Sequence, residues 1–537
     1  MNQDSASEDK YAKAESDAKK HNDAILKSPS KKNVVVAGPG TGKTYLFKTI
    51  LAGKSKALTL TFVNALVEDL SLELCGLSEV RTLHGFARGV LKTDSDDVKM
   101  FPRLPDVISE DAKILLGEEI KFKPIFYNRD DSNKHMEFYR KRRRYYDHYG
   151  FEDIVLAAVW LLDKKNDKIP TYEQILVDEF QDFNKLEVSL IDLLASKSPI
   201  LLAGDDDQAL YEFKDAKKEF IRQRHSEASA GYAPFSLPYC RRCTRVIVEA
   251  ANDIINAAIK NNFLNNRIKK SYQYFDHKKK DEVSDKNPKV MYARVFEGQI
   301  PWFIENQLGK IAKEEKEKFS VLIISPSTDK LLAISDAVEE KGLVTVESVD
   351  KKDEKDLGLL DGLKLLLEDK KSNLGWRIVL KSVLAKEAFE SLLKQTHTDA
   401  AKKIFEIVGA KPKKEVARML AVLRVIEKGE KINEEKFDEE EIGKLFKRLG
   451  FDPHESAKNL LRDEIVSSSR PVGNPSIRKL PIKGTTIERS KGLAAEYVFI
   501  THCDDRLLIA DKDKTKITDR EICKFLVAQT RAKKEFI

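Results

Sequence analysis

The protein has 537 residues, of which 41% are apolar and 34% are charged; this composition is typical of folded globular proteins and excludes a disordered or fibrous class. The length exceeds the roughly 250–300 residues at which single domains stop growing, which predicts several domains, whereas the net charge of +7 (95 basic against 88 acidic residues) is too small to indicate a polyanionic partner by itself. A polar N-terminus, no apolar run near the ~18 residues of a membrane span, and five irregularly spaced cysteines favour the cytoplasm.

Short apolar segments alternate with amphipathic ones in the first part of the chain. The apolar segments, which predict buried strands, are "NVVVAG", "ALTLTF", "ILVDEF" and "PILLAGDD". Between them, "TYLFKTILAG" and "NKLEVSLIDLLAS" predict helices. Strands that alternate with helices form a parallel sheet covered on both faces. We therefore expect a first α/β domain built from residues 1–87 and 151–232.

The same alternation returns after this first domain. One helix and three strands are predicted by "RVIVEAANDIINAAI", "FSVLIISPS", "KLPIKGTTI" and "YVFITH". They indicate a second α/β domain built from residues 233–372 and 476–537. Residues 88–150 and 373–475 lack this alternation and are mainly helical in pattern. The expected fold class is therefore α/β, with two parallel-sheet domains that are each interrupted by a helical insertion.

A glycine-rich turn, "GPGTGKT", lies directly between the first strand and the first helix. Backbone N–H groups of such a loop point at phosphates, and the helix N-terminus adds favourable partial charge. Lys43 would neutralise the β- and γ-phosphates, and the Thr44 hydroxyl would bind Mg²⁺. The alternative is a glycine-rich turn followed by a chance Lys-Thr pair, which the strand–loop–helix context disfavours. The expected nucleotide-binding residues of the loop are Gly38, Gly40, Thr41, Gly42, Lys43 and Thr44.

The segment "QILVDEFQDF" carries three carboxylates directly after a buried strand. In a protein with a phosphate-binding loop, an acid at the end of a second buried strand holds Mg²⁺. Asp178 fits this role, and Glu179 would accept a proton from the attacking water. The alternative, a charged helix start after a strand, fits less well beside the glycine-rich loop.

A second acidic turn, "LLAGDDDQALYEF", follows the next strand. Gln208 is expected to hydrogen-bond a γ-phosphate or the attacking water. Tyr211 and Phe213 stand at alternate positions and could stack on nucleic-acid bases. Ordinary packing of these two aromatic rings against the sheet is an equally open interpretation.

Taken together, these segments resemble the superfamily 1 DNA helicases of the UvrD/Rep/PcrA type. The resemblance extends in the expected order over nearly the whole chain. Further matching segments are "LTLTFVNALVEDL", "TLHGFA", "CRRCTRVIVEAANDI", "TTIERSKGL" and "FLVAQTRAKK". It implies two RecA-like motor domains that bind ATP and Mg²⁺ between them, and movement from 3′ to 5′ along single-stranded or partly duplex DNA.

The resemblance also assigns site residues. It places Arg242 and Arg531 at the γ-phosphate, where a fixed positive charge suits the transition state, and it places Arg241 and Gly492 at the nucleotide. The expected DNA-binding residues are Phe62, Asn64, Thr82, His84, Tyr211, Phe213 and Thr486.

The chain departs from this family at groups that select the nucleotide. Arg241 replaces the tyrosine that stacks on adenine, Ala494 replaces a glutamate, and Glu488 replaces a histidine. An arginine plane can also lie on a base. The N-terminal element that reads adenine has no clear counterpart in residues 1–33. All the expected phosphate and metal groups are present.

Two functions follow from these patterns. The first is an ATP-dependent translocase on single-stranded DNA and 3′–5′ DNA helicase. The alternative is a nucleotide-gated, DNA-binding regulatory subunit that activates a partner nuclease in a defence or repair complex. This alternative is suggested by the short insertions. A bacterial or phage-related origin is expected.

The "CRRC" segment (240–243) has the spacing of zinc or redox sites, but its position in a helicase motif is the preferred interpretation. The basic segment "YRKRRRYYDHYG" could bind phosphates or form a solvated helix face.

Overall fold

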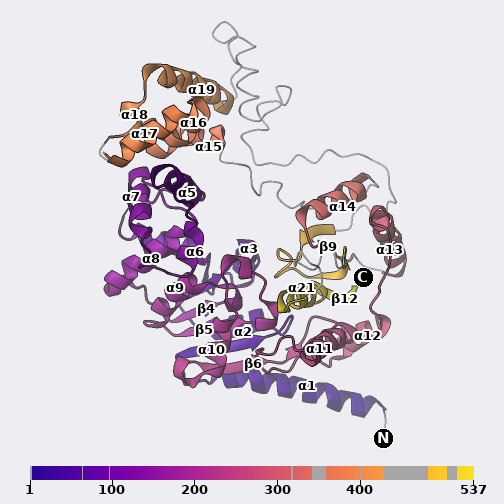
Figure 1. Cartoon of the computed structure of the whole chain (residues 1–537). Helices are drawn as coiled ribbons and strands as arrows, with labels where there is room; N and C mark the ends of the chain where they lie inside the picture. The colour runs from indigo at the N-terminus through magenta and orange to yellow at the C-terminus, as the bar shows by residue number, and fades with distance from the viewer. Residues whose placement is uncertain are drawn as a thin grey trace. The chain divides into compact units, whose positions relative to one another are not determined.

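A computed structural model describes most of the chain (Figure 1). The described residues are 3–62, 64–95, 97–315, 318–340, 358–398, 402–428, 482–504 and 517–537. The part of the expected second insertion from 429 to 475 lies outside them. The chain divides into two compact units: the first comprises Met1–Phe86, Val159–Lys351 and Arg470–Ile537, and the second comprises Ala87–Ala158 and Lys352–Ser469.

The first unit contains a six-stranded sheet in which every pairing is parallel. Its order is β3-β2-β4-β5-β1-β6. The strands are β1 (Lys32–Ala37), β2 (Ala57–Thr61), β3 (Glu79–Thr82), β4 (Gln174–Val177), β5 (Ile200–Gly204) and β6 (Ala233–Leu237). Strands β2 and β5 are buried along their whole length, and β1 and β4 are buried over most of theirs. Burial on both faces explains why these segments are continuously apolar.

Helices connect and cover these strands. They are α1 (Gln3–Leu26), α2 (Lys43–Leu51), α3 (Asn64–Glu73), α9 (Lys185–Ala195) and α10 (Glu219–Ser226), with α4 (Leu83–Lys92) and α8 (Asp153–Lys164) at the junctions with the second unit. The side chains of Leu46 and Phe47 on α2 join Val35 of β1 and Leu201 of β5 in one apolar core. This packing fixes where α2 begins relative to the end of β1.

A second parallel sheet lies in the same unit, with the order β10-β9-β11-β12. Its strands are β9 (Val321–Ser325), β10 (Ile482–Thr486), β11 (Ala495–Ile500) and β12 (Ala532–Phe536). The accompanying helices are α11 (Arg245–Lys260), α12 (Lys278–Lys286), α13 (Ile300–Glu314), α14 (Thr328–Glu340) and α21 (Asp519–Gln529). A short parallel pair, β7 (Tyr239–Cys240) and β8 (Gln273–Tyr274), stands apart from both sheets.

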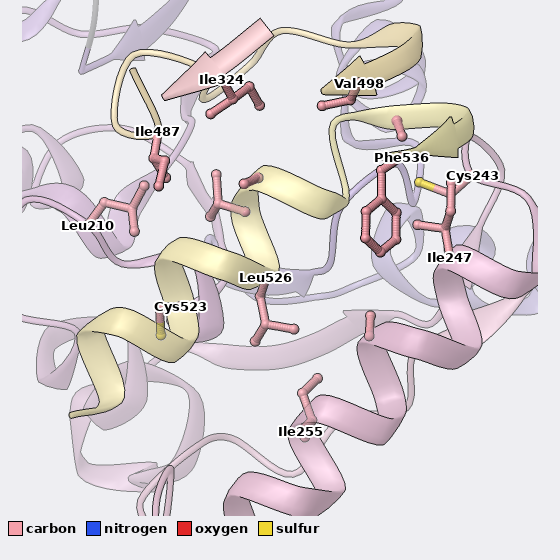
Figure 2. Packing of buried hydrophobic residues seen from close by; sticks show 14 of the residues in the cluster. Leu210, Cys243, Ile247, Ile255, Ile324, Ile487, Val498, Cys523, Leu526 and Phe536 are labelled. Carbon is pink, nitrogen blue, oxygen red and sulfur yellow. The ribbon is translucent and has the colours of Figure 1, made fainter. Parts of the chain in front are cut away.

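A shared core joins this second sheet to segments that follow the first one. Ile324 and Val498 of the second sheet belong to the same buried cluster as Leu210, which follows β5. Figure 2 shows Cys243, Ile247 and Phe536 beside one another, and Leu526 of α21 within the same cluster. Residues far apart in the sequence are thereby brought around one core.

The second unit is helical in its described residues. Its helices are α5 (Leu104–Leu115), α6 (Phe122–Tyr127), α7 (Met136–Tyr146), α15 (Leu359–Glu368), α16 (Asn373–Val383), α17 (Lys386–Thr398), α18 (Ile404–Ile407) and α19 (Ala410–Lys428). A buried ionic cluster links its two chain segments. Asp111 of α5 accepts hydrogen bonds from Arg142 of α7 at 2.9 Å and from Arg377 of α16 at 3.0 Å. Both arginines hold the pKa of Asp111 below its usual value, although burial alone would raise it.

The mixed α/β character and the parallel sheets predicted from the sequence are confirmed. The division into two motor domains with the stated boundaries stays a prediction. The sequence patterns did not predict α1, a polar helix of 24 residues. Within the described residues, no helix combines the length and apolar character needed to span a membrane.

The Asp111 cluster yields a prediction about stability. Asp111→Ala leaves the buried Arg142 guanidinium without its carboxylate and leaves Arg377 with Glu110 alone, and we expect it to lower the free energy of unfolding by about 3–5 kcal/mol in chemical denaturation at pH 7. Because the pKa of Asp111 is lowered on folding, its ionised form stabilises the native state at neutral pH, and this stabilisation is lost as the pH falls. The difference between the two proteins should therefore shrink below about pH 4.

Glu137→Ala serves as the matched control. Glu137 forms an exposed ion pair with Lys141 one turn away on α7, and its loss should cost less than about 1 kcal/mol. An equal effect of the two substitutions would contradict a structural role for the buried cluster.

Candidate functional site

The loop between β1 and α2 has a backbone that only glycine adopts easily. Gly40 and Gly42 have φ angles of 69° and 92°, in the left-handed region. Gly42 is also the N-cap residue, directly before α2. A Cβ atom on Gly40 would lie 2.5 Å from the Cβ atom of Arg242. The loop therefore packs against the segment that carries Arg242, and glycine is required at position 40 for both conformation and space.

Lys43, the first residue of α2, lies between two carboxylates at the end of β4. Its Nζ atom is 3.0 Å from Asp178 Oδ1 and 2.7 Å from Glu179 Oε1. Burial alone would lower the pKa of Lys43, but the two carboxylates outweigh it and raise this pKa. For Glu179, burial is outweighed by the charges of Lys43 and Lys491, and its pKa is lowered. Burial is the main reason that the pKa of Asp178 is raised. The predicted metal, base and phosphate residues are thus in direct contact.

Gln181 links the ends of two neighbouring strands. Its Nε2 atom donates to Glu179 Oε2 at 2.7 Å, and its Oε1 atom accepts from the backbone N–H of Asp205 at 3.0 Å. Glu179 itself has a φ angle of 54°, a strained conformation for a non-glycine residue. A Cβ atom on Gly204 would lie 2.3 Å from Gln181 Oε1. The orientation of the Glu179 carboxylate is therefore fixed by its neighbours.

Two cations from the segments around the second sheet reach the same site. Lys491 Nζ donates to Asp182 and, at 2.7 Å, to the backbone carbonyl of Gln208. Arg531 Nη2 donates to Gln208 Oε1 at 3.2 Å. Burial, opposed by Lys491, raises the pKa of Asp182 to about 6, and burial together with the charge of Arg242 lowers the pKa of Arg531 to about 10. The sequence had singled out Gln208 and Arg531 but not the direct contact of Lys491 with Asp182.

Arg242 and Arg241 approach the loop from the β7 side. The Nε atom of Arg242 is buried and has no hydrogen-bond partner within the described residues. The backbone N–H of Arg241 donates to the carbonyl of Gly40 at 2.8 Å. The Arg241 guanidinium lies 3.8 Å from the centroid of the Phe275 ring and forms an ion pair with Glu15 of α1 at 3.1 Å. α1 thus contacts the residue that the resemblance assigns to the nucleotide base.

Three consecutive carboxylates, Asp205, Asp206 and Asp207, form a buried cluster whose oxygen atoms could hold a cation. Lys270 Nζ already lies 2.5 Å, 2.5 Å and 2.9 Å from them, in that order. Arg267 adds an ion pair with Asp207 at 2.7 Å. The cluster is therefore neutralised by protein cations. The sequence analysis did not predict these partners, because the segment that carries them, "NNRIKK" (265–270), matches no known motif.

Of the residues expected to bind DNA, Phe62 and Tyr211 lie together. Their ring centroids are 4.7 Å apart, and Lys214 Nζ lies 5.3 Å from the Phe62 centroid. Tyr211 is buried and donates through its hydroxyl to the carbonyl of Glu488 at 3.1 Å, which favours packing over stacking for this ring in the free protein. Phe62 is half-buried and keeps an accessible portion.

The remaining expected residues are more dispersed. Thr82 accepts the backbone N–H of Gly85 at 3.1 Å where β3 passes into α4. Burial, together with the charge of Lys214, lowers the pKa of His84 to about 3, so His84 is neutral at pH 7. Thr486 is buried at the end of β10, and Gly492 has a φ angle of 85°. The side chains of Asn64 and Phe213 lie outside the described part of the structure.

Comparison with known proteins gives consistent matches. Residues 126–229 match the family model of the UvrD/REP helicase N-terminal domain. The probable DNA helicase II homolog of Mycoplasma genitalium is 24% identical over 359 residues, which are 54% of this chain and 49% of the relative. The ATP-dependent DNA helicase PcrA of Staphylococcus aureus is 24% identical over 274 residues, 41% of this chain and 37% of the relative. The ATP-dependent DNA helicase srs2 of Schizosaccharomyces pombe is 32% identical over 139 residues, 24% and 15% respectively.

The glycine-rich loop, the lysine between two carboxylates and the parallel sheets define a P-loop nucleotide-binding protein of mixed α/β fold. With the matches above, the chain is similar to the UvrD-like superfamily 1 helicases. The matched regions cover about half or less of the length of these curated relatives.

The position of Gly40 leads to a prediction. Gly40→Ala adds a left-handed strain of about 1 kcal/mol and a clash with Arg242, whereas Gly53→Ala adds only the strain, because Gly53 has a φ angle of 78° and nothing within 4 Å of its Cβ position. We expect Gly40→Ala to lower the free energy of unfolding by at least about 1 kcal/mol more than Gly53→Ala, measured by urea denaturation. Equal losses would show that the loop does not pack on Arg242.

Proposed function

We propose that the protein is an ATP-dependent translocase on single-stranded DNA and a 3′–5′ DNA helicase. In this proposal two RecA-like motor domains, each interrupted by a helical insertion, couple ATP hydrolysis to movement. The observation that carries it is the convergence of Lys43, Asp178 and Glu179 with Arg531 and Lys491 around one phosphate-binding loop. The 3′–5′ direction rests on the resemblance to the helicase family. The proposal makes the protein a DNA-dependent ATPase.

The residues present fit a nucleoside triphosphate with Mg²⁺. The Gly40 backbone leaves no room for a side chain, the buried Nε of Arg242 lacks a partner within the described residues, and Thr44 with Asp178 supplies the oxygen donors that Mg²⁺ prefers. When bound, Mg²⁺ would neutralise phosphate charge. The phosphates would be held by backbone N–H groups of the loop and by Lys43.

Glu179 is suited to accept the proton of the attacking water. Its lowered pKa keeps it ionised, as a base must be. In the free protein Lys43 occupies one of its oxygens, while Gln181 holds the other at 2.7 Å. Once the phosphates draw Lys43 away, one carboxylate oxygen becomes available and the second stays anchored. Binding of substrate thus prepares the base.

Arg242 and Arg531 are proposed to stabilise the charge that builds on the transferred phosphoryl group. Arg531 contacts Gln208 at 3.2 Å, and Arg242 packs on the loop itself. Mutual repulsion of the two guanidinium groups contributes to the lowered pKa of Arg531. A bound phosphate relieves that repulsion, so the arginines favour the nucleotide-bound arrangement.

The same contacts can transmit hydrolysis to the DNA-binding residues. Lys491 reaches Asp182 and the carbonyl of Gln208, and Tyr211, three residues further along, bonds the carbonyl of Glu488. A change of phosphate charge acts first on these polar links between the two sheets. We propose that the resulting shift moves Phe62 and Lys214, which lie against Tyr211.

Lys43→Ala and Glu179→Gln test the hydrolytic site. Each should lower the kcat of DNA-stimulated ATP hydrolysis by about 100-fold or more, since one removes phosphate charge stabilisation and the other the general base. Lys48→Ala is the matched control, because Lys48 lies on the same helix and pairs with the exposed Glu73; its kcat should stay within about twofold of the wild type. Hydrolysis at the wild-type rate by Lys43→Ala would refute the proposal.

The nucleic-acid surface gives a further prediction. Phe62→Ala should weaken binding of single-stranded DNA by about 1–3 kcal/mol without changing its salt dependence, because base stacking carries no counterion release. Lys214→Ala should reduce the slope of log K against log salt by roughly 1. Fluorescence anisotropy with labelled oligonucleotides between 50 and about 200 mM salt measures both.

The alternative, a regulatory subunit beside a nuclease, shares this nucleotide site and differs in its output. Unwinding of a forked substrate by the isolated chain supports the helicase. DNA-stimulated hydrolysis without unwinding, even at saturating protein, would favour the regulatory subunit.

A further inference from the structure

Two cysteines flank the arginines that approach the phosphate-binding loop. Cys240 ends β7 and Cys243 precedes α11, and both are fully buried. Cys523, also buried, lies apart from them on α21 (Figure 2), whereas Cys75 and Cys503 are exposed. Within the described residues, the only group of three or more potential metal-ligating side chains is the Asp205–Asp207 cluster, so the cysteine pair lacks the ligands of a zinc site.

The two cysteines contact each other. The backbone N–H of Cys243 donates to Cys240 Sγ at 3.4 Å. Burial would raise the pKa of Cys240, but the Cys243 thiol, the charge of Lys280 and the Tyr272 hydroxyl together lower it well below its usual value. The hydrogen bond to Cys240 and burial raise the pKa of Cys243. These surroundings favour the thiolate form at Cys240 rather than at Cys243, an arrangement that favours thiol chemistry.

The pair is also in contact with the nucleotide site. Cys240 Sγ lies 3.3 Å from the position that a Cβ atom on Gly40 would take, next to Arg242. Cys243 Sγ donates to the carbonyl of Thr530 at 3.7 Å, directly before Arg531. A change at the two sulfurs would act on the loop and on both arginines through single contacts.

A small cavity lies beside residues that contact the two sulfurs. Tyr272 and Thr530, which contact Cys240 and Cys243, line a cavity of about 30 Å³ beside Gly38 and Pro39 of the loop. This volume accommodates a molecule of about the size of water. In the switch proposed below, hydrogen peroxide, which is only slightly larger than water, approaches the pair from this cavity.

We propose that Cys240 and Cys243 form a thiol–disulfide switch that turns off nucleotide hydrolysis when they are oxidised. The effect on hydrolysis rests on the proposed function, whereas formation of the disulfide does not.

The reaction balances with peroxide as the oxidant. The Cys240 thiolate attacks one peroxide oxygen, breaks the O–O bond and becomes a sulfenic acid, while the departing hydroxide takes up a proton as water. The Cys243 thiol loses its proton and attacks the sulfenic sulfur; an S–S bond forms and the second oxygen leaves as water. The two sulfurs give up two electrons in total, which reduce one peroxide to two water molecules.

The disulfide changes the geometry around Arg242. Its sulfurs lie ~2.05 Å apart with a dihedral near ±90°, closer than thiols in hydrogen-bonding contact. Only Arg241 and Arg242 separate the two cysteines along the chain. When the sulfurs come closer, the turn that carries these two arginines must therefore tighten. The thiolate charge opposite Lys280 and the hydrogen bond from Cys243 are also lost. The Arg242 side chain then leaves its position against Gly40.

The test uses the full-length chain with Cys75→Ser and Cys503→Ser, which removes the exposed thiols. The protein is compared after treatment with dithiothreitol and with hydrogen peroxide. Peptide mapping under non-reducing conditions should find a Cys240–Cys243 crosslink that is 2 mass units lighter than the dithiol. DNA-stimulated ATP hydrolysis should fall at least tenfold on oxidation and recover on reduction.

Substitutions separate the pair from other effects of peroxide. The measured quantity is the ratio of oxidised to reduced activity in each variant, so a change of basal rate does not affect it. Cys243→Ala, and independently Cys240→Ala, should bring this ratio close to one. Cys523→Ala, the buried cysteine outside the pair, should keep the wild-type ratio.

The outcomes decide between the two proposals. A crosslinked protein that hydrolyses ATP at the reduced rate would overturn the switch, and so would failure of the two cysteines to crosslink. If the reduced protein hydrolysed no ATP, the proposed function would fail instead. The switch would then be judged by binding of a fluorescent ATP analogue, which should weaken at least tenfold in the crosslinked protein.

Discussion

The site depends on one buried interaction, the contact of Lys43 with Asp178 and Glu179. It brings the start of α2 to the end of β4, so that the phosphate-binding loop and the acidic strand end share one location. Burying a lysine and two carboxylates away from water costs desolvation free energy unless the three groups pair with one another. Here the remaining oxygen of Glu179 is taken by Gln181, and the backbone N–H of Glu179 bonds to Asp178. The charges that chemistry requires are thereby kept in place before any substrate arrives.

The cations around this contact come from different segments of the chain. Lys43 begins α2 at the end of the loop, Lys491 and Arg531 come from the segments of the second sheet, and Arg242 packs against Gly40 of the loop. The acidic turn after β5 is neutralised separately by Lys270 and Arg267. Asp178 and Glu179, which directly follow β4, are therefore the acidic groups that contact Lys43. The polar links between the sheets therefore converge on residues 178–182 and 205–211. In the proposed function, a change of phosphate charge acts first on these residues.

The cysteine pair adds a second input to the same arginines. In the proposed function, nucleotide acts on Arg242 and Arg531 through charge, and in the proposed switch the sulfurs act on them through the covalent geometry of one turn and the carbonyl of Thr530. α1 contacts this turn too, since Glu15 pairs with Arg241. Residues 240–243 therefore join the loop, the N-terminal helix and the second sheet, and small changes there have several routes to the site.

The strands, the glycine-rich loop and the acids at strand ends could be predicted from the amino-acid sequence, because strand periodicity and loop chemistry are local properties of the chain. Lys43, Asp178, Glu179 and Gln208 are therefore proposed as site residues from their local context, and Arg531 through resemblance. The contacts between distant groups could be found only in the folded chain: Lys270 lies among the three aspartates, Glu15 pairs with Arg241, Lys491 pairs with Asp182, and Cys240 lies against Gly40. These contacts join segments separated by tens to hundreds of residues. Their pairing depends on how the sheets and helices pack, which no local pattern encodes.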